Sequence, residues 1–255
     1  MRMRPSIGLA AALAAAGCGS LRPSAQDPGE EPASPGEIDA IVALTLSAPV
    51  ADGSVLVEGV SESSGGSHRG FAAGVFAEAR AEVAFASFES TFVGLPSQLD
   101  VDVSGDSDHQ RTEYRHTEIC LGPELVHGGS ESGSPSGRPL SIAPFAGVRF
   151  SRFVVREEPL GDGHGEAWAD GIAGARVEAR LRPGLLLRLK GDTLIFGRSD
   201  EAWRASAAVV YGTDETRVAA GWECLSVDFE GDTGIERVRY NVFLGGPFIA
   251  IEFWF

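Results

Sequence analysis

The sequence has 255 residues, of which 43% are hydrophobic, so the chain can bury a core of domain size and is not globally disordered. Its formal net charge of −15 repels phosphate backbones, which argues against nucleic acid as a partner. It contains no run of about 20 apolar residues, the length that a membrane-spanning helix needs.

The first 17 residues have the layout of a bacterial export signal. Arg2 and Arg4 form a positive start, residues 7–16 are mostly Ala and Leu, and small residues lead to Cys18. This arrangement resembles the lipobox of bacterial lipoproteins, in which the cysteine after the cut receives a diacylglycerol. We therefore expect residues 1–17 to be a signal peptide and Cys18 to be the lipidation site. The alternative is an ordinary cleaved signal with a cut that happens to lie near a cysteine.

Residues 19–37 are rich in Pro, Ser, Gly and Glu, a composition that buries too little apolar surface to order itself. We expect a disordered linker there, which tethers the exported N-terminus to a folded body. The body, residues 38–255, is predicted to be a single β-barrel domain.

In the body the hydrophobic pattern repeats every two residues, which indicates strands rather than helices. In residues 185–196, for example, Leu185, Leu187, Leu189, Thr193 and Ile195 face one way, whereas Arg188, Lys190 and Asp192 face the other. The pattern predicts about ten strands, with eight as the alternative. The expected strands are 38–47, 70–79, 81–93, 111–127, 139–155, 168–181, 184–196, 203–211, 217–230 and 238–255.

Short and long connections mostly alternate between these strands, as in membrane β-barrels with short periplasmic turns and longer external loops. The expected short turns are 80–82, 182–184 and 212–215, the expected long links are 61–69, 94–110, 156–167 and 197–202, and a long segment at 128–138 breaks the alternation. An even strand number would place both ends of the barrel on one side.

The last residues, 247–255, alternate between apolar and other side chains and finish on Phe255. A terminal Phe after such a strand resembles the insertion signal of bacterial outer-membrane barrels. This implies that the barrel-assembly machinery is a partner through the strand ending at Phe255. The alternative is a buried closing strand of a soluble barrel.

Several short motifs follow one another in the second half of the chain. They are PFAGVR at 144–149, WAD at 168–170, GAR at 174–176, LKGD at 189–192, FG at 196–197, GWE at 221–223, VDF at 227–229 and GPF at 246–248. In this order, residues 142–255 resemble a group of small bacterial outer-membrane β-barrel proteins of uncharacterised role. Glu223 and residues 193–194 depart from the group, which usually has a basic residue and glycines there. The resemblance implies an all-β, closed antiparallel up-and-down β-barrel in a membrane, and it implies no reaction.

If the apolar face of each strand meets lipid, the charged face lines the barrel. The predicted inward charges are Glu78, Arg80, Glu82, Arg149, Asp170, Arg176, Glu178, Arg180, Arg188, Lys190, Asp192, Arg204 and Glu252. Buried charges persist only when they are paired, and ten strands leave little free lumen. We therefore expect an interior plugged by ion pairs, with a narrow polar channel as the alternative.

Cys120 and Cys224 fall on the fourth and ninth expected strands, which lie opposite each other in a ten-stranded barrel. A disulfide needs Cα atoms less than about 7 Å apart, so we predict that these cysteines are not bridged.

No catalytic, metal or cofactor site is predicted. His68, His109 and His164 fall in expected loops near carboxylates, but their spacing matches no ligand motif, so we interpret them as parts of solvated acidic loops. The sequence contains no GxSxG, and Ser206 and Ser226 have no neighbouring histidine.

Together these patterns predict an outer-membrane β-barrel (lipo)protein, surrounded by outer-membrane lipids, with a structural or interaction role and no enzyme activity. One alternative is a soluble, lipocalin-like lipoprotein anchored at the periplasmic face and binding an apolar ligand. A narrow passive pore and a barrel hydrolase acting through external loops are the others. The orientation of the apolar face separates the first two hypotheses, because a lipocalin hides its apolar face inside.

Overall fold

The computed structural model describes residues 38–57, 68–81, 83–96, 110–127, 140–157, 163–232 and 237–255. The expected signal peptide (1–17), Cys18 and the expected linker (19–37) lie outside these residues, so the structure does not test them. Within the described part of the chain, no helix is long and apolar enough to cross a membrane.

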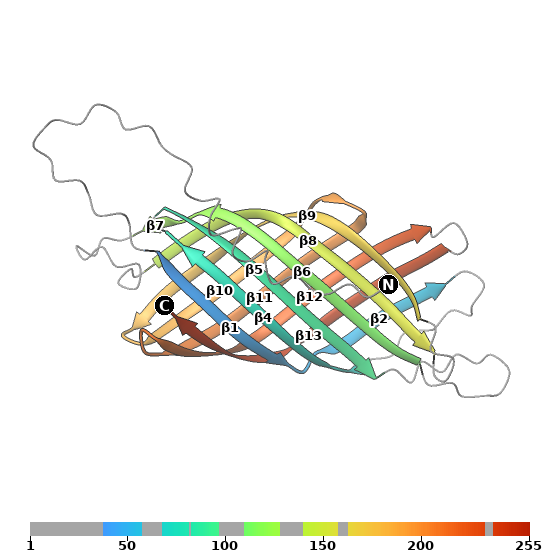
Figure 1. Cartoon of the computed structure of the whole chain (residues 1–255), viewed down its shortest axis with the longest axis horizontal. Coiled ribbons are helices and arrows are strands. Elements are labelled where there is room, and N and C mark those ends of the chain that lie inside the picture. Colours follow the sequence, from blue (N-terminus) through green and yellow to red (C-terminus); the bar gives the residue numbers. More distant parts are fainter. Residues whose placement is uncertain are drawn as a thin grey trace, which may run out of the picture. The chain divides into compact units, whose positions relative to one another are not determined.

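Thirteen strand segments form one antiparallel sheet (Figure 1). They are β1 (Asp39–Ser47), β2 (Val50–Val57), β3 (His68–Arg69), β4 (Phe71–Arg80), β5 (Ala84–Pro96), β6 (Gln110–Pro123), β7 (Leu125–His127), β8 (Leu140–Glu157), β9 (Gly163–Arg182), β10 (Leu185–Gly197), β11 (Ser199–Gly212), β12 (Thr216–Asp232) and β13 (Arg237–Trp254).

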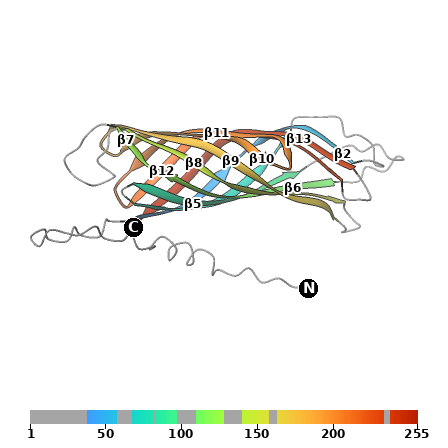
Figure 2. The ribbon, with the colours of Figure 1, turned by 90° about the horizontal axis from the view of Figure 1, so that it is seen from above.

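The sheet closes into a barrel of ten strands, as the sequence predicts. The ring order is β1-β4-β5-β6-β8-β9-β10-β11-β12-β13, and β13 pairs back with β1. Short interruptions make β2 a continuation of β1, β3 a continuation of β4, and β7 a continuation of β6. The final strand accordingly pairs with β1 along residues 248–254 and with β2 along residues 238–245. The strands run obliquely across the barrel in both views (Figures 1 and 2).

Both ends of the barrel chain lie on one side. The Ala40 N–H donates to the Phe255 carbonyl at 3.1 Å, and the Phe255 N–H donates to the Ala40 carbonyl at 2.9 Å. We call this side the terminal end; it also carries the connections from β4 to β5, from β9 to β10 and from β11 to β12. The opposite side is the loop end, where β5, β8, β10 and β12 finish.

The pairing register of the strands places charged side chains on the inner face of the barrel wall and apolar side chains on the outer face. In the β10–β11 pair, Lys190 lies opposite Ser206 on the inside, whereas Leu189 lies opposite Ala207 on the outside. Because side chains alternate along a strand, a shift of one residue would turn the whole charged set outward. The hydrophobic pattern therefore specifies the register strongly.

The prediction of a long link between the seventh and eighth expected strands is wrong. Residues 197–202 are not a polar loop, because β10 ends at Gly197 and β11 begins at Ser199. The Asp170 carboxylate accepts hydrogen bonds from the backbone N–H groups of Arg198 (3.0 Å) and Ser199 (3.1 Å). Gly197 adopts a φ of +154°, and a Cβ there would lie 2.2 Å from the Asp170 carboxylate. A tertiary contact from β9 thus stabilises a turn that the local sequence does not reveal.

Other boundaries also differ from the prediction. The expected link at 156–167 is shorter, because β8 extends to Glu157 and β9 begins at Gly163. His164 and His68 consequently lie in strand segments rather than in loops. His109 and the long segment 128–138 lie outside the described residues.

Candidate functional site in the barrel interior

The outer face of the barrel carries an uncharged band. No Asp, Glu, Lys or Arg occupies the following outward positions of the described strands: even positions of 40–46, 84–90, 140–150 and 218–226, and odd positions of 71–79, 117–125, 167–181, 185–195, 203–211 and 243–255. Many of these side chains are large, apolar and exposed, including Leu44 (59%) and Ile249 (52%). We call this surface the outer band.

The inner face, in contrast, holds three layers. An aromatic plug lies toward the loop end and consists of Tyr114, Phe153, Trp168, Phe229 and Tyr240. A central cluster of charges consists of Glu89, Glu118, Arg149, Lys190, Asp192, Arg204 and Glu223. A terminal cluster of charges consists of Glu78, Arg80, Arg176, Glu178, Arg188 and Glu252.

The aromatic plug is stacked across the barrel. The Trp168 and Phe229 rings lie 4.1 Å apart at 17°, and Phe153 and Tyr240 lie 4.2 Å apart. The Trp168 indole N–H is within hydrogen-bonding distance of Asp170 Oδ2 (3.0 Å) and Ser199 Oγ (2.9 Å). All five rings are 5% exposed or less and pack with apolar side chains of the surrounding strands.

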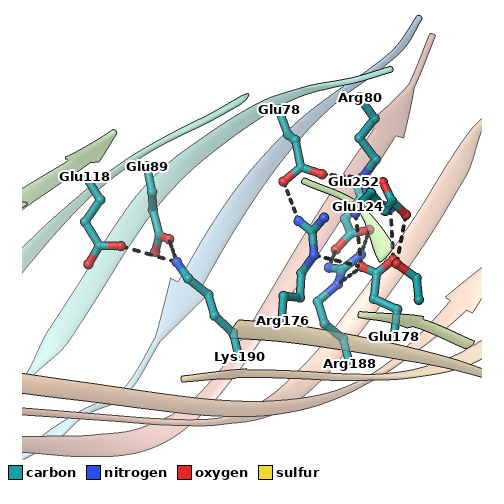
Figure 3. A network of polar contacts seen from close by, with 11 residues as sticks. Glu78, Arg80, Glu89, Glu118, Glu124, Arg176, Glu178, Arg188, Lys190 and Glu252 are labelled. Carbon is teal, nitrogen blue, oxygen red and sulfur yellow. Dashed lines mark hydrogen bonds and ion pairs between the residues drawn. The ribbon is translucent and has the colours of Figure 1, made fainter. Parts of the chain in front are cut away.

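At the centre of the central cluster are three buried ions, Arg149, Glu118 and Asp192. Arg149 is 0% exposed and contacts Glu118 at 2.8 Å and Asp192 at 2.5 Å. Lys190 lies between Glu89 (3.1 Å) and Glu118 (3.2 Å), as Figure 3 shows. The cluster contains three cations and four carboxylates. Each cation contacts at least two carboxylates, which compensates for the cost of burying its charge.

The terminal cluster contains three arginines and three glutamates. Glu178 accepts hydrogen bonds from Arg80 at 2.9 and 3.1 Å and from Arg188 at 2.6 Å. Arg188 also pairs with Glu252, and Glu78 pairs with both Arg80 and Arg176 (Figure 3). Because the six residues come from β4, β9, β10 and β13, the cluster cross-links strands from different parts of the ring.

A cavity of about 120 Å³ lies among the two charged clusters. Its polar lining includes Ser87, Thr91, Lys190 and Ser206. A volume of this size holds a few water molecules, which would satisfy buried polar atoms that have no protein partner, such as Arg176 Nη2. The lining includes residues of both charged clusters and no residue of the aromatic plug.

The structure confirms most of the predicted inward charges as members of the two clusters. Asp170 is also buried, but it caps the β10–β11 turn instead of pairing with a cation. Arg180 is half-buried and has no ion pair with a described residue. Glu82 lies outside the described residues.

Sequence reasoning missed Glu89, Glu118 and Glu223 as inward charges, as well as the whole aromatic plug. The sequence contained a signal for the plug. Trp168 lies two residues before the inward Asp170, and Phe153 lies four residues after the inward Arg149, so each is on the same face of its strand as the charge. The same alternation that places charges inside also places these rings inside.

The two cysteines are free, as predicted. Cys120 is buried on the inner face of β6, whereas Cys224 is half-exposed on the outer face of β12. The described residues contain no group of three or more side chains suited to hold a metal ion. The side chains of His68 and His164, like the whole of His109, lie outside what the structure describes.

Comparisons with known proteins find likeness in solved structures alone, since no protein-family model and no curated protein matches the sequence. Ail of Yersinia pestis, the attachment invasion locus protein, is 10% identical with a TM-score of 0.35 over 85% of this chain and 99% of its own. The translocator domain of the autotransporter NalP from Neisseria meningitidis is 12% identical with a TM-score of 0.39 over 85% and 88%. A major outer membrane protein from Thermus thermophilus is 13% identical with a TM-score of 0.37 over 83% and 99%. These structures are outer-membrane β-barrel proteins, and they are too distant to indicate what this barrel does.

Proposed function

We propose that this chain is an outer-membrane β-barrel protein with a structural or interaction role and a non-conducting interior. The observation that carries the proposal is the distribution of charge across the wall, because the outer band is uncharged whereas the inner face holds two clusters of charges. A large apolar surface exposed to water drives aggregation, whereas the same surface is stable against lipid. We also propose that residues 1–17 direct export and that Cys18 is lipidated.

The height of the outer band fits a bilayer. On β8 the uncharged outward positions run from Leu140 to Phe150. At about 3.3 Å per residue and a strand tilt of about 40°, this stretch is roughly 25 Å tall, which is the apolar height typical of outer-membrane barrels.

The same sidedness argues against the lipocalin-like alternative. A soluble barrel that binds an apolar ligand has an apolar lumen and a charged exterior. Here the middle of the lumen holds Arg149, Lys190 and Arg204 with their carboxylate partners, so an apolar ligand would have to displace paired ions.

The layered interior supports a plugged barrel over a pore. A conducting pore needs a continuous water path, and the aromatic plug and the two charged clusters obstruct it at three levels. We expect no measurable conductance when the protein is inserted in a planar bilayer.

Membrane integration is tested on the full chain expressed with its signal in a Gram-negative host. The outer-membrane fraction is washed with high salt and alkali and then run on a gel with and without boiling. We expect the protein to stay in the membrane and to change mobility on heating. Extraction by the wash together with unchanged mobility would revive the soluble alternative.

We propose that β13 engages the barrel-assembly machinery. The proposal is supported by the outward row of Ile249, Ile251, Phe253 and Phe255 at the end of this strand. Phe255→Ser should lower the heat-modifiable fraction in cells while leaving refolding from urea into detergent unchanged. Equal loss in both assays would mean that Phe255 acts on stability alone.

Lipidation of Cys18 has a separate test. Radiolabelled palmitate should be incorporated into the wild-type protein and not into Cys18→Ser. Incorporation into both proteins would exclude Cys18 as the modified residue.

A further inference from the structure

An arginine pair lies on the outer face of the barrel, next to the outer band. Arg115 on β6 and Arg152 on β8 are direct register partners, and both are exposed. In the same cross-strand row, Arg115 lies opposite Phe92 of β5, with the guanidinium 5.7 Å from the Phe92 ring centre. Two like charges directly opposite each other repel, so an anion between them would stabilise the pair.

Neither arginine forms an ion pair with any described residue. Two other exposed arginines at the loop end do have acidic partners, since Arg239 lies 3.8 Å from Asp228 and Arg198 lies 3.1 Å from Glu166. Arg115 and Arg152 differ from those two arginines in having no acidic partner among the described residues.

The arginine pair lies at the edge of the outer band. The next row toward the terminal end contains Ser90, Thr117 and Phe150, and the outward positions beyond it are uncharged. The arginines thus lie at the boundary between the uncharged band and the loop end. In a barrel whose chain ends lie on the periplasmic side, this boundary is the headgroup level of the outer leaflet.

We propose that Arg115 and Arg152 together bind the phosphate of a phosphorylated lipid headgroup in the outer leaflet. The inference rests on the proposed membrane location and adds the lipid partner. Guanidinium groups donate paired hydrogen bonds to phosphate oxygens, and one phosphate between the two arginines removes their repulsion. Phe92 and Phe150 flank the pair and can contact the acyl chains below the headgroup. A chain with a formal charge of −15 repels such a lipid elsewhere, which concentrates binding at this basic pair.

The test uses the full-length protein, purified in neutral detergent and titrated with lipid A, with dephosphorylated lipid A or with inorganic phosphate. Native mass spectrometry counts the bound lipid. The variant Arg115→Gln/Arg152→Gln is compared with Arg239→Gln, which removes an outward arginine from the opposite side of the ring. A fourth protein, Arg115→Lys/Arg152→Lys, keeps the charge and loses the guanidinium geometry.

Wild-type and Arg239→Gln proteins should bind lipid A equally, and the double Gln variant should bind about tenfold more weakly. The double Lys variant should fall between them, and dephosphorylated lipid A should bind all four proteins alike. Equal lipid A binding by wild-type protein and the double Gln variant would overturn the inference. Full competition by millimolar inorganic phosphate would also overturn it, because the site would then bind a free anion.

Heat-dependent gel mobility is recorded for every protein in the same samples. A wild-type protein without a mobility shift would contradict the membrane barrel itself, whereas shifted proteins with equal lipid binding contradict the lipid site alone. If the double Gln variant lacks the shift, the single variants Arg115→Gln and Arg152→Gln provide the comparison, and each should bind more weakly than Arg239→Gln.

Discussion

At the residue scale, the interior depends on matched charges. Arg149 is fully buried, and its two carboxylate partners differ in how well they are satisfied without it. Glu118 also contacts Lys190 and Arg204, whereas Asp192 has no other cationic partner among the described residues. Loss of Arg149 should therefore leave mainly Asp192 as an uncompensated buried charge.

We expect Arg149→Leu to lower the free energy of unfolding by about 3–5 kcal/mol, measured by urea denaturation in lipid vesicles. Arg149→Leu/Asp192→Leu should recover a large part of this loss, because no unpaired carboxylate remains on β10. If the double variant is as unstable as the single one, the loss comes from packing rather than from the buried charge.

Cys224 offers a second residue-scale prediction, because it is the outward cysteine of the two described. A nitroxide attached to Cys224 in a Cys18→Ser/Cys120→Ser background should relax faster with oxygen, which concentrates in lipid, than with a water-soluble nickel chelate. The reverse order in vesicles would place the outer face of β12 in water and would contradict the proposed membrane setting.

At the element scale, neighbouring strands position one another. Asp170 on β9 accepts from the two backbone N–H groups at the β10–β11 turn and also lies within 3.0 Å of the Trp168 indole nitrogen. One carboxylate therefore joins the tightest described connection at the loop end to the aromatic plug. The plug in turn packs β8, β9, β12 and β13 against one another across the lumen.

Phenylalanines on opposite faces give a matched test of the plug. Phe229→Ala removes a fully buried ring and should cost about 3–5 kcal/mol of unfolding free energy. Phe243→Ala removes a ring that is 39% exposed on the outer face and should cost clearly less, because lipid fills the space. Equal costs in urea denaturation would argue that the plug is loosely packed.

At the scale of the whole molecule, the barrel assigns polar groups to its lumen and apolar groups to its exterior. The inner clusters contain six cations and seven carboxylates, so their charges nearly cancel. In the proposed membrane setting, the cost of an outward charge should depend on its depth.

Leu189→Arg places a charge near the middle of the outer band and should cost about 2–4 kcal/mol in vesicles, whereas Phe253→Arg, near the terminal end, should cost about 0–1 kcal/mol. The two variants are compared by urea denaturation in the same lipid. Equal costs would mean that the outer band does not span an apolar layer.

Much of the fold follows from the sequence. Alternation alone predicts ten strands and places Arg188, Lys190 and Asp192 on one face, because side chains of a strand point alternately to its two sides. It also predicts that Cys120 and Cys224 lie on opposite walls. The prediction fails at residues 197–202, where the turn depends on Asp170 of another strand.

The sequence by itself determined most of the strand pattern, the closed antiparallel barrel and the face on which most of the inward charges lie, because these depend on period two and on neighbouring strands. The tertiary structure decided which charges pair, that rings close the loop end, and that Arg115 and Arg152 lie side by side. Those contacts join residues far apart in the chain, such as Arg80 and Glu178, and the distances between them are fixed only when the ring closes.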